Sequence, residues 1–218
     1  MFIGHYAVAL AAKRAVPKLS LGTLFLSTQL IDLFWPIFLL LGLEHVRIDP
    51  GNTVVTDFDF YDYPITHSLL GVILWSLALG VIYFLVRRYS RGAYVVGAVV
   101  FSHWILDLIT HRPDLPLIPG MDIYAGLGLW NSFAGTLLVE GGLFITAVIL
   151  YARSIKALDS VGFYAFWGLI IFLLLAYISN LFSAPPPDET SVALATLMLW
   201  LFIPWGYWID RHRKIVDS

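Results

Sequence analysis

Long apolar runs separated by short polar segments dominate this sequence. About 20 apolar residues are enough for a helix to cross the roughly 30 Å hydrocarbon layer of a bilayer. Six runs meet this requirement, at residues 21–43, 66–86, 92–111, 129–152, 161–182 and 192–209. Pro64 precedes the second run and Pro113 follows the third, which supports these edges. The pattern predicts an all-α integral membrane protein with about six transmembrane helices.

The first residues form a shorter apolar segment that ends at Lys13 and Arg14. Twelve helical residues extend only about 18 Å, which is too short to cross a bilayer. The segment has no basic residue in front of its apolar part, unlike a signal peptide, and we expect it to be retained. We therefore predict a short N-terminal helix that is either re-entrant or interfacial.

Composition supports a single membrane-embedded domain over residues 1–218. The chain is 59% hydrophobic and 13% charged, whereas about a quarter of the residues in soluble domains are charged. Its basic residues gather at the ends of runs and form no patch suited to nucleic acid, so we expect no nucleic-acid partner. The absence of cysteine limits any metal site to nitrogen and oxygen ligands.

Basic residues occupy alternate connections between the runs. The four clusters are Lys13, Arg14 and Lys18; Arg87, Arg88 and Arg91; Arg153 and Lys156; and Arg211, Arg213 and Lys214. Positively charged loops tend to remain on the cytoplasmic side of a membrane. We therefore expect these connections and the C-terminus to be cytoplasmic, and the remaining connections to lie outside.

The strongest candidate for chemistry is the row His103, Asp107 and His111 in the third run. Positions i, i+4 and i+8 of a helix fall within an arc of about 80°, so the three side chains would share one face. Imidazole and carboxylate groups suit zinc or manganese. Inserting an ionisable group into a membrane costs about 2.5 to 3.5 kcal/mol, so three such groups in one row need an interaction that offsets this cost. The alternative is a hydrogen-bonded polar seam between helices.

Other ionisable residues fall at a similar depth. Counting 1.5 Å per residue from the cytoplasmic ends places His5, Asp32, His103 and Glu140 about 14 to 18 Å into the membrane, with Asp107 at about 23 Å. We expect these groups to share one layer. His67 and His111 lie nearer the outer surface. The acidic residues Asp57, Asp59 and Asp62 precede His67 in an outer loop, where we expect them to be solvated.

These residues carry a resemblance to a known family. They stand in the order Gly4-His5, Asp32, Thr66-His67-Ser68, Ser102-His103-Trp104-Ile105-Leu106-Asp107 and His111. This order resembles the membrane-bound metal-dependent hydrolases, also described as LexA-regulated inner-membrane hydrolases, over roughly residues 1–140. The resemblance implies a metal-dependent hydrolase of the bacterial inner membrane, with residues 141–218 as additional transmembrane helices.

A looser likeness exists to zinc-dependent phospholipase C and P1-type nucleases. Those enzymes add a later His-x-x-x-Glu, whereas Thr136 stands four residues before Glu140 here. Members of the membrane family also carry a His-Arg pair where this chain has Tyr61-Asp62-Tyr63-Pro64. Both departures leave the number of metal ions open.

Two functions are consistent with these residues. In the first, a divalent metal, zinc or manganese, activates water against an amphiphilic substrate reached from the outer leaflet. A phosphoester or phosphodiester lipid is favoured, and an ester or amide lipid remains open. The metal ligands would be His5, Asp32, His67, His103, Asp107 and His111. Asp32 or Glu140 would be the general base, provided that the residue is not itself a ligand. In the second, the same residues form the relay of a proton- or metal-ion-coupled transporter.

Overall fold

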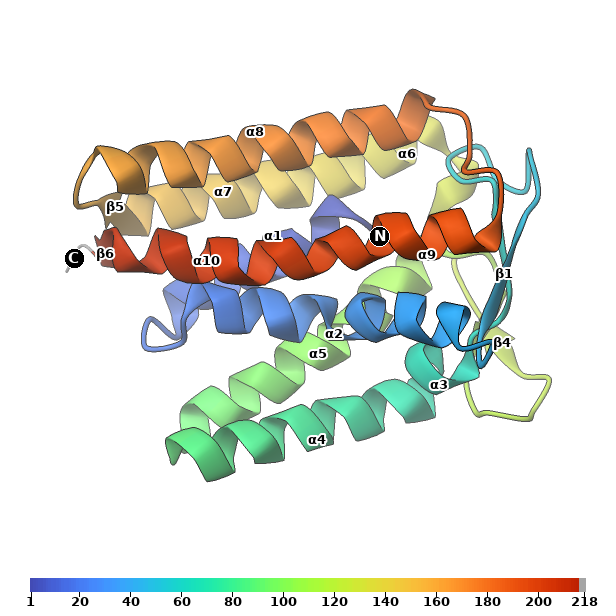
Figure 1. Cartoon of the computed structure of the whole chain (residues 1–218), viewed down its shortest axis with the longest axis horizontal. Helices are drawn as coiled ribbons and strands as arrows, with labels where there is room; N and C mark the ends of the chain where they lie inside the picture. Colours follow the sequence, from blue (N-terminus) through green and yellow to red (C-terminus); the bar gives the residue numbers. More distant parts are fainter. Residues whose placement is uncertain (216–218) are drawn as a thin grey trace.

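The computed structural model describes residues 1–215 and confirms an all-α membrane fold. Six helical segments are long and apolar enough to cross a membrane (Figure 1). They are α2 (Leu21–Leu40), α4 (Leu69–Arg87), α5 (Ser90–Thr110), the segment Phe133–Ser154, α8 (Ser160–Phe182) and the segment Glu189–Arg211. The protein is therefore a polytopic membrane protein.

Two of the six spans are composite. Phe133–Ser154 contains α6 (Phe133–Thr136), a π-helical turn (Leu137–Gly141) and α7 (Gly142–Ser154). Glu189–Arg211 contains α9 (Glu189–Leu197), a 3₁₀ turn (Met198–Leu201) and α10 (Phe202–Arg211). A π-helical turn within a helix often marks a functional site, and this one carries Glu140.

The short N-terminal helix α1 (Ile3–Ala15) lies inside the bundle. It packs against α2, α5 and α7, and the chain start lies near the middle of the molecule (Figure 1). Ile3, Tyr6 and Leu10 are fully buried. An interfacial helix would keep one face towards water, so the interfacial alternative is wrong for this segment. The helix instead begins within the bundle, which is consistent with a re-entrant segment.

Helices α1 and α2 form the centre of the molecule. The hairpin of α4 and α5 flanks them on one side, and α7 and α8 lie on the other, with α10 beside α2 (Figure 1). Glycines allow α2 and α10 to touch closely, because a Cβ atom added to Gly206 would come within 2.9 Å of the Gly22 backbone. Small residues permit such approach between membrane helices. The two central helices are thus held on every side by other spans.

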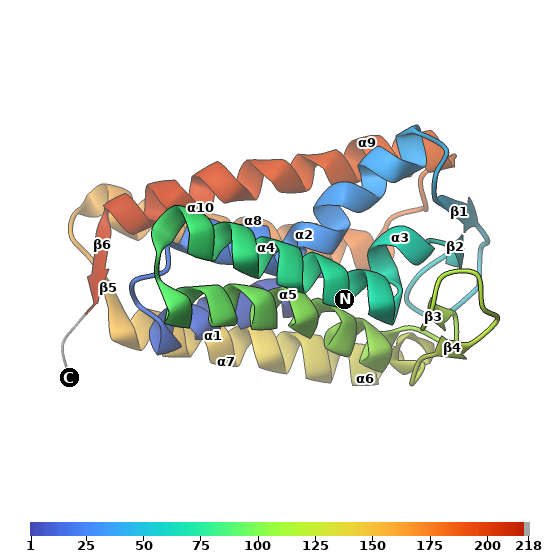
Figure 2. The ribbon, with the colours of Figure 1, turned by 90° about the horizontal axis from the view of Figure 1, so that it is seen from below.

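Short two-stranded sheets mark the two ends of the bundle (Figure 2). At one end, β1 (His45–Ile48) pairs with β2 (Phe58–Asp62), and β3 (Leu115–Pro116) pairs with β4 (Tyr124–Ala125), followed by a 3₁₀ turn (Leu129–Asn131). At the other end, β5 (Ile155–Ala157) pairs with β6 (Arg213–Ile215). All three pairs are antiparallel. We call these the β1 end and the β5 end.

The second predicted span is interrupted at its start. Pro64–His67 forms a separate helical turn, α3, and Ser68 adopts an extended backbone before α4 begins. The Ser68 hydroxyl accepts a hydrogen bond from the Gly71 amide at 3.0 Å, so Ser68 is the N-cap of α4. Thr66 and His67 therefore belong to a turn whose direction differs from that of a continuous helix with α4.

Candidate metal centre

Five ionisable side chains from four helices meet at one place in the bundle. His5 comes from α1, Asp32 from α2, His67 from α3, and His103 and Asp107 from α5. They form two groups in which the possible ligand atoms lie within 4.8 Å of one another, and His103 belongs to both. The sequence had predicted all five as ligands, and the structure brings them together.

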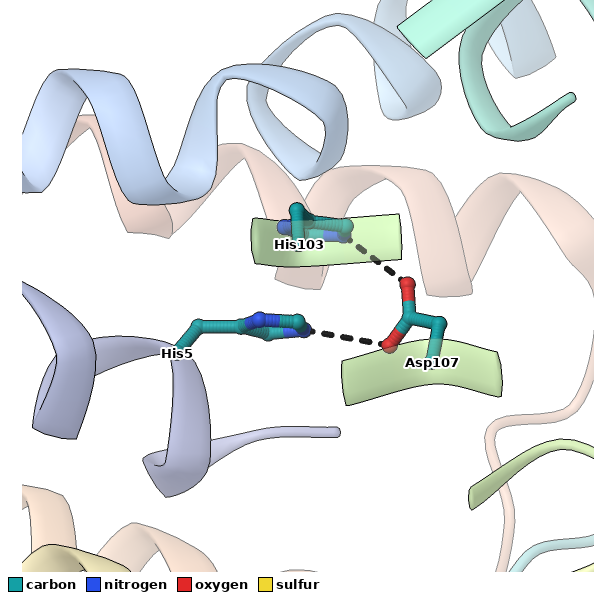
Figure 3. A group of neighbouring side chains, drawn as sticks. All are labelled: His5, His103 and Asp107. Atoms are coloured by element: carbon teal, nitrogen blue, oxygen red, sulfur yellow. Dashed lines mark ion pairs between the residues drawn. The ribbon is translucent and has the colours of Figure 1, made fainter. Parts of the chain in front are cut away.

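The first group contains His5, His103 and Asp107 (Figure 3). One Asp107 oxygen lies 3.2 Å from His5 Nε2, and the other lies 3.1 Å from His103 Nε2. The two imidazole rings stack with their centroids 3.7 Å apart and their planes 2° from parallel. Both rings thus present their Nε2 atoms to the same carboxylate.

The second group contains Asp32, His67 and His103. Asp32 Oδ1 lies 3.4 Å from His67 Nε2 and 3.6 Å from His103 Nε2. In both groups, therefore, it is the Nε2 atom of each histidine that faces a carboxylate. A uniform choice of nitrogen is typical of rings arranged around a shared cation.

Hydrogen bonding does not account for this arrangement. Among the described residues, both ring nitrogens of His5 and Nε2 of His103 have no hydrogen-bond partner, although all three are buried. Nε2 of His5 and Nε2 of His103 each lie close to an Asp107 oxygen, but that oxygen does not lie along the ring N–H direction that a hydrogen bond requires. A cation bound at about 2.0 to 2.1 Å in tetrahedral geometry holds its ligand atoms about 3.3 Å apart. The separations of 3.1 to 3.6 Å match this value. A cation would satisfy the two Nε2 atoms, which favours a metal centre over a hydrogen-bonded polar seam.

The orientation of His103 limits the number of ions it can serve. Its Nδ1 lies 2.8 Å from the Thr28 carbonyl oxygen. Because a carbonyl only accepts, Nδ1 carries the proton and Nε2 keeps its single lone pair. One lone pair binds one ion, so the two groups cannot both use His103 at once. The five residues therefore make up one centre built around His103.

The centre is buried except at Asp32. The side chains of His5, His103 and Asp107 are at most 2% exposed, and that of His67 is 6% exposed. Asp32 is 24% exposed, so a water-sized molecule reaches its carboxylate. Pro36 follows one turn later and cannot donate a hydrogen bond to the Asp32 carbonyl, which gives α2 a cause to bend beside the centre.

Neither Glu140 nor His111 belongs to the two groups. Glu140 Oε2 lies 3.1 Å from the Phe2 amide and accepts its hydrogen bond at the start of α1. Glu140, which was predicted as a possible general base, is therefore hydrogen-bonded to the backbone. Close by, the Met1 amino nitrogen lies 2.7 Å from Asp107 Oδ1.

His111 was predicted as a ligand because it continues the i, i+4 row, and the structure corrects this. Helix α5 ends at Thr110, and His111 has an extended backbone with ψ 147°. Its Nδ1 lies 3.0 Å from Asp114 and 3.3 Å from the Tyr63 hydroxyl. Its ring lies 4.5 Å from that of Trp130. His111 therefore borders the centre on the side of the β1 end without joining either group.

Sequence reasoning missed two buried carboxylates at the β1 end. Glu44 is fully buried and accepts hydrogen bonds from Thr66, the neighbour of His67. Burial raises the pKa of the Glu44 carboxyl, and the nearby His67 and the Thr66 hydrogen bonds oppose that rise. Asp59, expected to be solvated, is only 8% exposed and forms ion pairs with Arg47 and Arg112. Both carboxylates lie outside the helices, where apolar periodicity gives no signal.

A pocket of about 200 Å³ opens beside Tyr63 at the β1 end. The β2–α3 segment and the β3–β4 hairpin form its walls. The Tyr63 ring lies 4.9 Å from the His67 ring, which connects the pocket wall to the centre. A second pocket of about 300 Å³ lies between α8 and α10, near Trp205 and Trp208, and holds none of the five ligand residues.

No protein-family model, curated protein or solved structure matches the chain. Its function is therefore inferred from the geometry of these five residues and from the order of the motifs that carry them.

Proposed function

We propose that the protein is a metal-dependent hydrolase that acts on a lipid-like substrate within the membrane. The observation that carries this proposal is the convergence of three imidazole Nε2 atoms and two carboxylates, with buried nitrogens that no hydrogen bond satisfies. The motif order supports it through its resemblance to membrane-bound metal-dependent hydrolases.

The residues present fit a divalent cation, with zinc preferred and manganese as the alternative. Asp32 and Asp107 supply two negative charges, and His5, His67 and His103 supply neutral nitrogen ligands. A divalent cation held there would act as a Lewis acid on a phosphoryl oxygen and lower the pKa of water. Because His103 serves one ion, we expect one ion per chain.

Asp32 is the residue best placed to handle a proton. It is the most exposed member of the centre, while the other ligands remain enclosed. A general base needs contact with both the attacking water and the centre, and Asp32 has this position. Glu140 is engaged by the Phe2 amide, which leaves it less free for this task.

The substrate class follows from the location of the centre. A site between membrane helices selects amphiphiles, and a cation suits phosphoryl oxygens, so we favour a phosphoester or phosphodiester lipid. The basic clusters would place the β5 end in the cytoplasm and the β1 end outside. The substrate would then approach from the outer leaflet of a bacterial inner membrane.

The transporter alternative needs a polar path from the centre to both sides of the membrane. Towards the β5 end, α1, α2 and α5 bury one packed apolar cluster that includes Leu10, Leu24, Phe25 and Val96. The same helices also bury a few polar side chains, among them Lys13, Ser27 and Gln29. Lys13 is positively charged and pairs with Asp210, so this side offers a cation few ligands beyond the centre. This observation favours the hydrolase.

The first experiment measures metal in the purified protein by mass spectrometry. We expect about one zinc or manganese ion per chain, and its loss in both His103→Ala and Asp107→Ala. His45→Ala is the matched control, because His45 is half-buried beside Glu189 outside the centre and should keep its metal. Full metal content in both centre variants would contradict the proposal.

The second experiment tests the chemistry. Phospholipids and other lipid phosphoesters are supplied in detergent, and release of the headgroup is followed before and after removal of metal with a chelator. We expect hydrolysis to stop on chelation and to return on addition of zinc. Metal-dependent ion flux in proteoliposomes, without hydrolysis of any lipid tested, would favour the transporter instead.

A further inference from the structure

Glu44 and Thr66 form a chain of hydrogen bonds that ends at His67. The Thr66 hydroxyl donates to Glu44 Oε2 at 2.7 Å, and the Thr66 amide donates to Glu44 Oε1 at 2.7 Å. The Thr66 hydroxyl oxygen also lies 2.7 Å from His67 Nδ1. All three residues are at most 5% exposed, so water does not compete for these bonds.

The chemistry of this chain fixes the direction of each bond. An ionised carboxylate only accepts, so Thr66 gives its single hydroxyl proton to Glu44. The Thr66 oxygen must then accept the proton on His67 Nδ1. The opposite nitrogen, Nε2, keeps its lone pair and faces Asp32 Oδ1 at 3.4 Å. Hydrogen bonds of this kind are known to set the tautomer and orientation of histidine ligands.

We propose that Glu44 is a positioning residue that acts through Thr66 to hold His67 with a free Nε2 for the cation. The inference rests on the proposed function, because it assigns His67 a ligand role. The placement of α3 allows this hydrogen-bond chain from Glu44 to His67 to form. The break at Ser68 lets Thr66 and His67 turn towards the loop after α2, which carries Glu44, while α2 itself supplies Asp32.

The substitution Glu44→Gln reverses the chain without changing its size. The new amide nitrogen would donate to the Thr66 oxygen, and the Thr66 hydroxyl would then donate to His67 Nδ1. His67 would carry its proton on Nε2 and lose the lone pair that faces Asp32. Thr66→Val removes the hydroxyl altogether, whereas Thr66→Ser keeps it and is the matched control.

The tautomer of His67 is measured by nitrogen-15 NMR of histidine-labelled, metal-free protein in lipid, with His67→Ala used to assign the signal. We expect the Nδ1-protonated form in the wild type and in Thr66→Ser. Glu44→Gln should shift His67 towards the Nε2-protonated form. This readout requires no metal, and a residue that only braced the loop would not change it.

The affinity for zinc is measured by competition with a chelator. Loss of an outer-shell partner typically weakens binding by about 10- to 100-fold, which we expect for Glu44→Gln and Thr66→Val. In a His67→Ala background, Glu44→Gln should have no further effect. The visible spectrum of the cobalt-loaded protein should change in the same variants and be preserved in Thr66→Ser.

The outcomes separate this inference from the proposed function. If the wild type binds zinc but His67 is protonated on Nε2, or if Glu44→Gln weakens binding equally with and without His67, the positioning role is wrong and the metal centre stands. If the wild type binds no zinc, the proposed function fails, and the ligand role of His67 fails with it.

Discussion

Two carboxylates, Asp32 and Asp107, determine the electrostatics of the centre. Asp32 has two imidazoles as neighbours, and among residues 1–215 neither lysine nor arginine pairs with it. An isolated charge within a membrane costs several kcal/mol, so such residues persist when something compensates them. The proposed divalent cation, shared with Asp107, would provide that compensation and would explain why the three histidines turn the same nitrogen inwards.

The first prediction separates a ligand from its neighbour. His111→Ala should leave zinc content and affinity unchanged, because the His111 ring is engaged by Asp114, Tyr63 and Trp130. His67→Ala should weaken zinc binding by more than the roughly 10- to 100-fold caused by losing an outer-shell partner. Both are measured by chelator competition on purified protein. An equal loss of zinc affinity in the two variants would mean that His111 is also a metal ligand.

Sequence spacing identified part of the centre and failed for physical reasons elsewhere. His103 and Asp107 are found by their i, i+4 spacing, which holds because both lie within α5. The same rule fails at His111 because the helix ends one residue earlier. Glu44 lies in a loop, where no periodic pattern exists, and only the folded chain brings it to Thr66.

At the scale of single elements, α1 presents an unusual problem. A helix that begins inside a membrane leaves its first amide groups without helical partners and without water. Glu140 meets part of this need, since its carboxylate accepts the Phe2 amide. The π-helical turn places Glu140 facing the start of α1. The two elements therefore depend on each other.

The second prediction tests this dependence. Glu140→Ala should destabilise the protein by about 1 to 3 kcal/mol, because it leaves a buried amide without an acceptor. Glu140→Gln keeps an acceptor oxygen and should retain most of the stability. Thermal unfolding in detergent provides the measurement. Leu138→Ala is the control on the same turn, because Leu138 is 76% exposed in the structure and faces outwards.

The long helices followed from their apolar runs, since a membrane leaves each backbone few alternatives to a helix. The helix boundaries were less predictable. Ser68 interrupts the second span because its hydroxyl caps α4. The apolar residues around Ser68 continue the hydrophobic pattern, so the sequence pattern does not reveal this break. The depth count placed His5 correctly because α1 enters the bundle beside α2.

For the whole molecule, the two ends differ in what they carry. The β1 end holds the pocket beside Tyr63 and the network of Arg47, Asp59 and Arg112. The β5 end carries the basic clusters that follow α4, α7 and α10. Apolar side chains of α1, α2 and α5 separate that end from the centre. Under the proposed function, a substrate would approach from the β1 end, and the orientation of the molecule would decide which leaflet supplies it.

The third prediction determines that orientation. The natural chain contains no cysteine, so each introduced cysteine is the sole target of a maleimide reagent. Asp122→Cys at the β1 end and Leu158→Cys at the β5 end both lie at exposed positions. In intact cells a membrane-impermeant maleimide should label the first and spare the second, and permeabilised cells should label both. The reverse pattern would place the β1 end in the cytoplasm, and the substrate would then have to come from the inner leaflet.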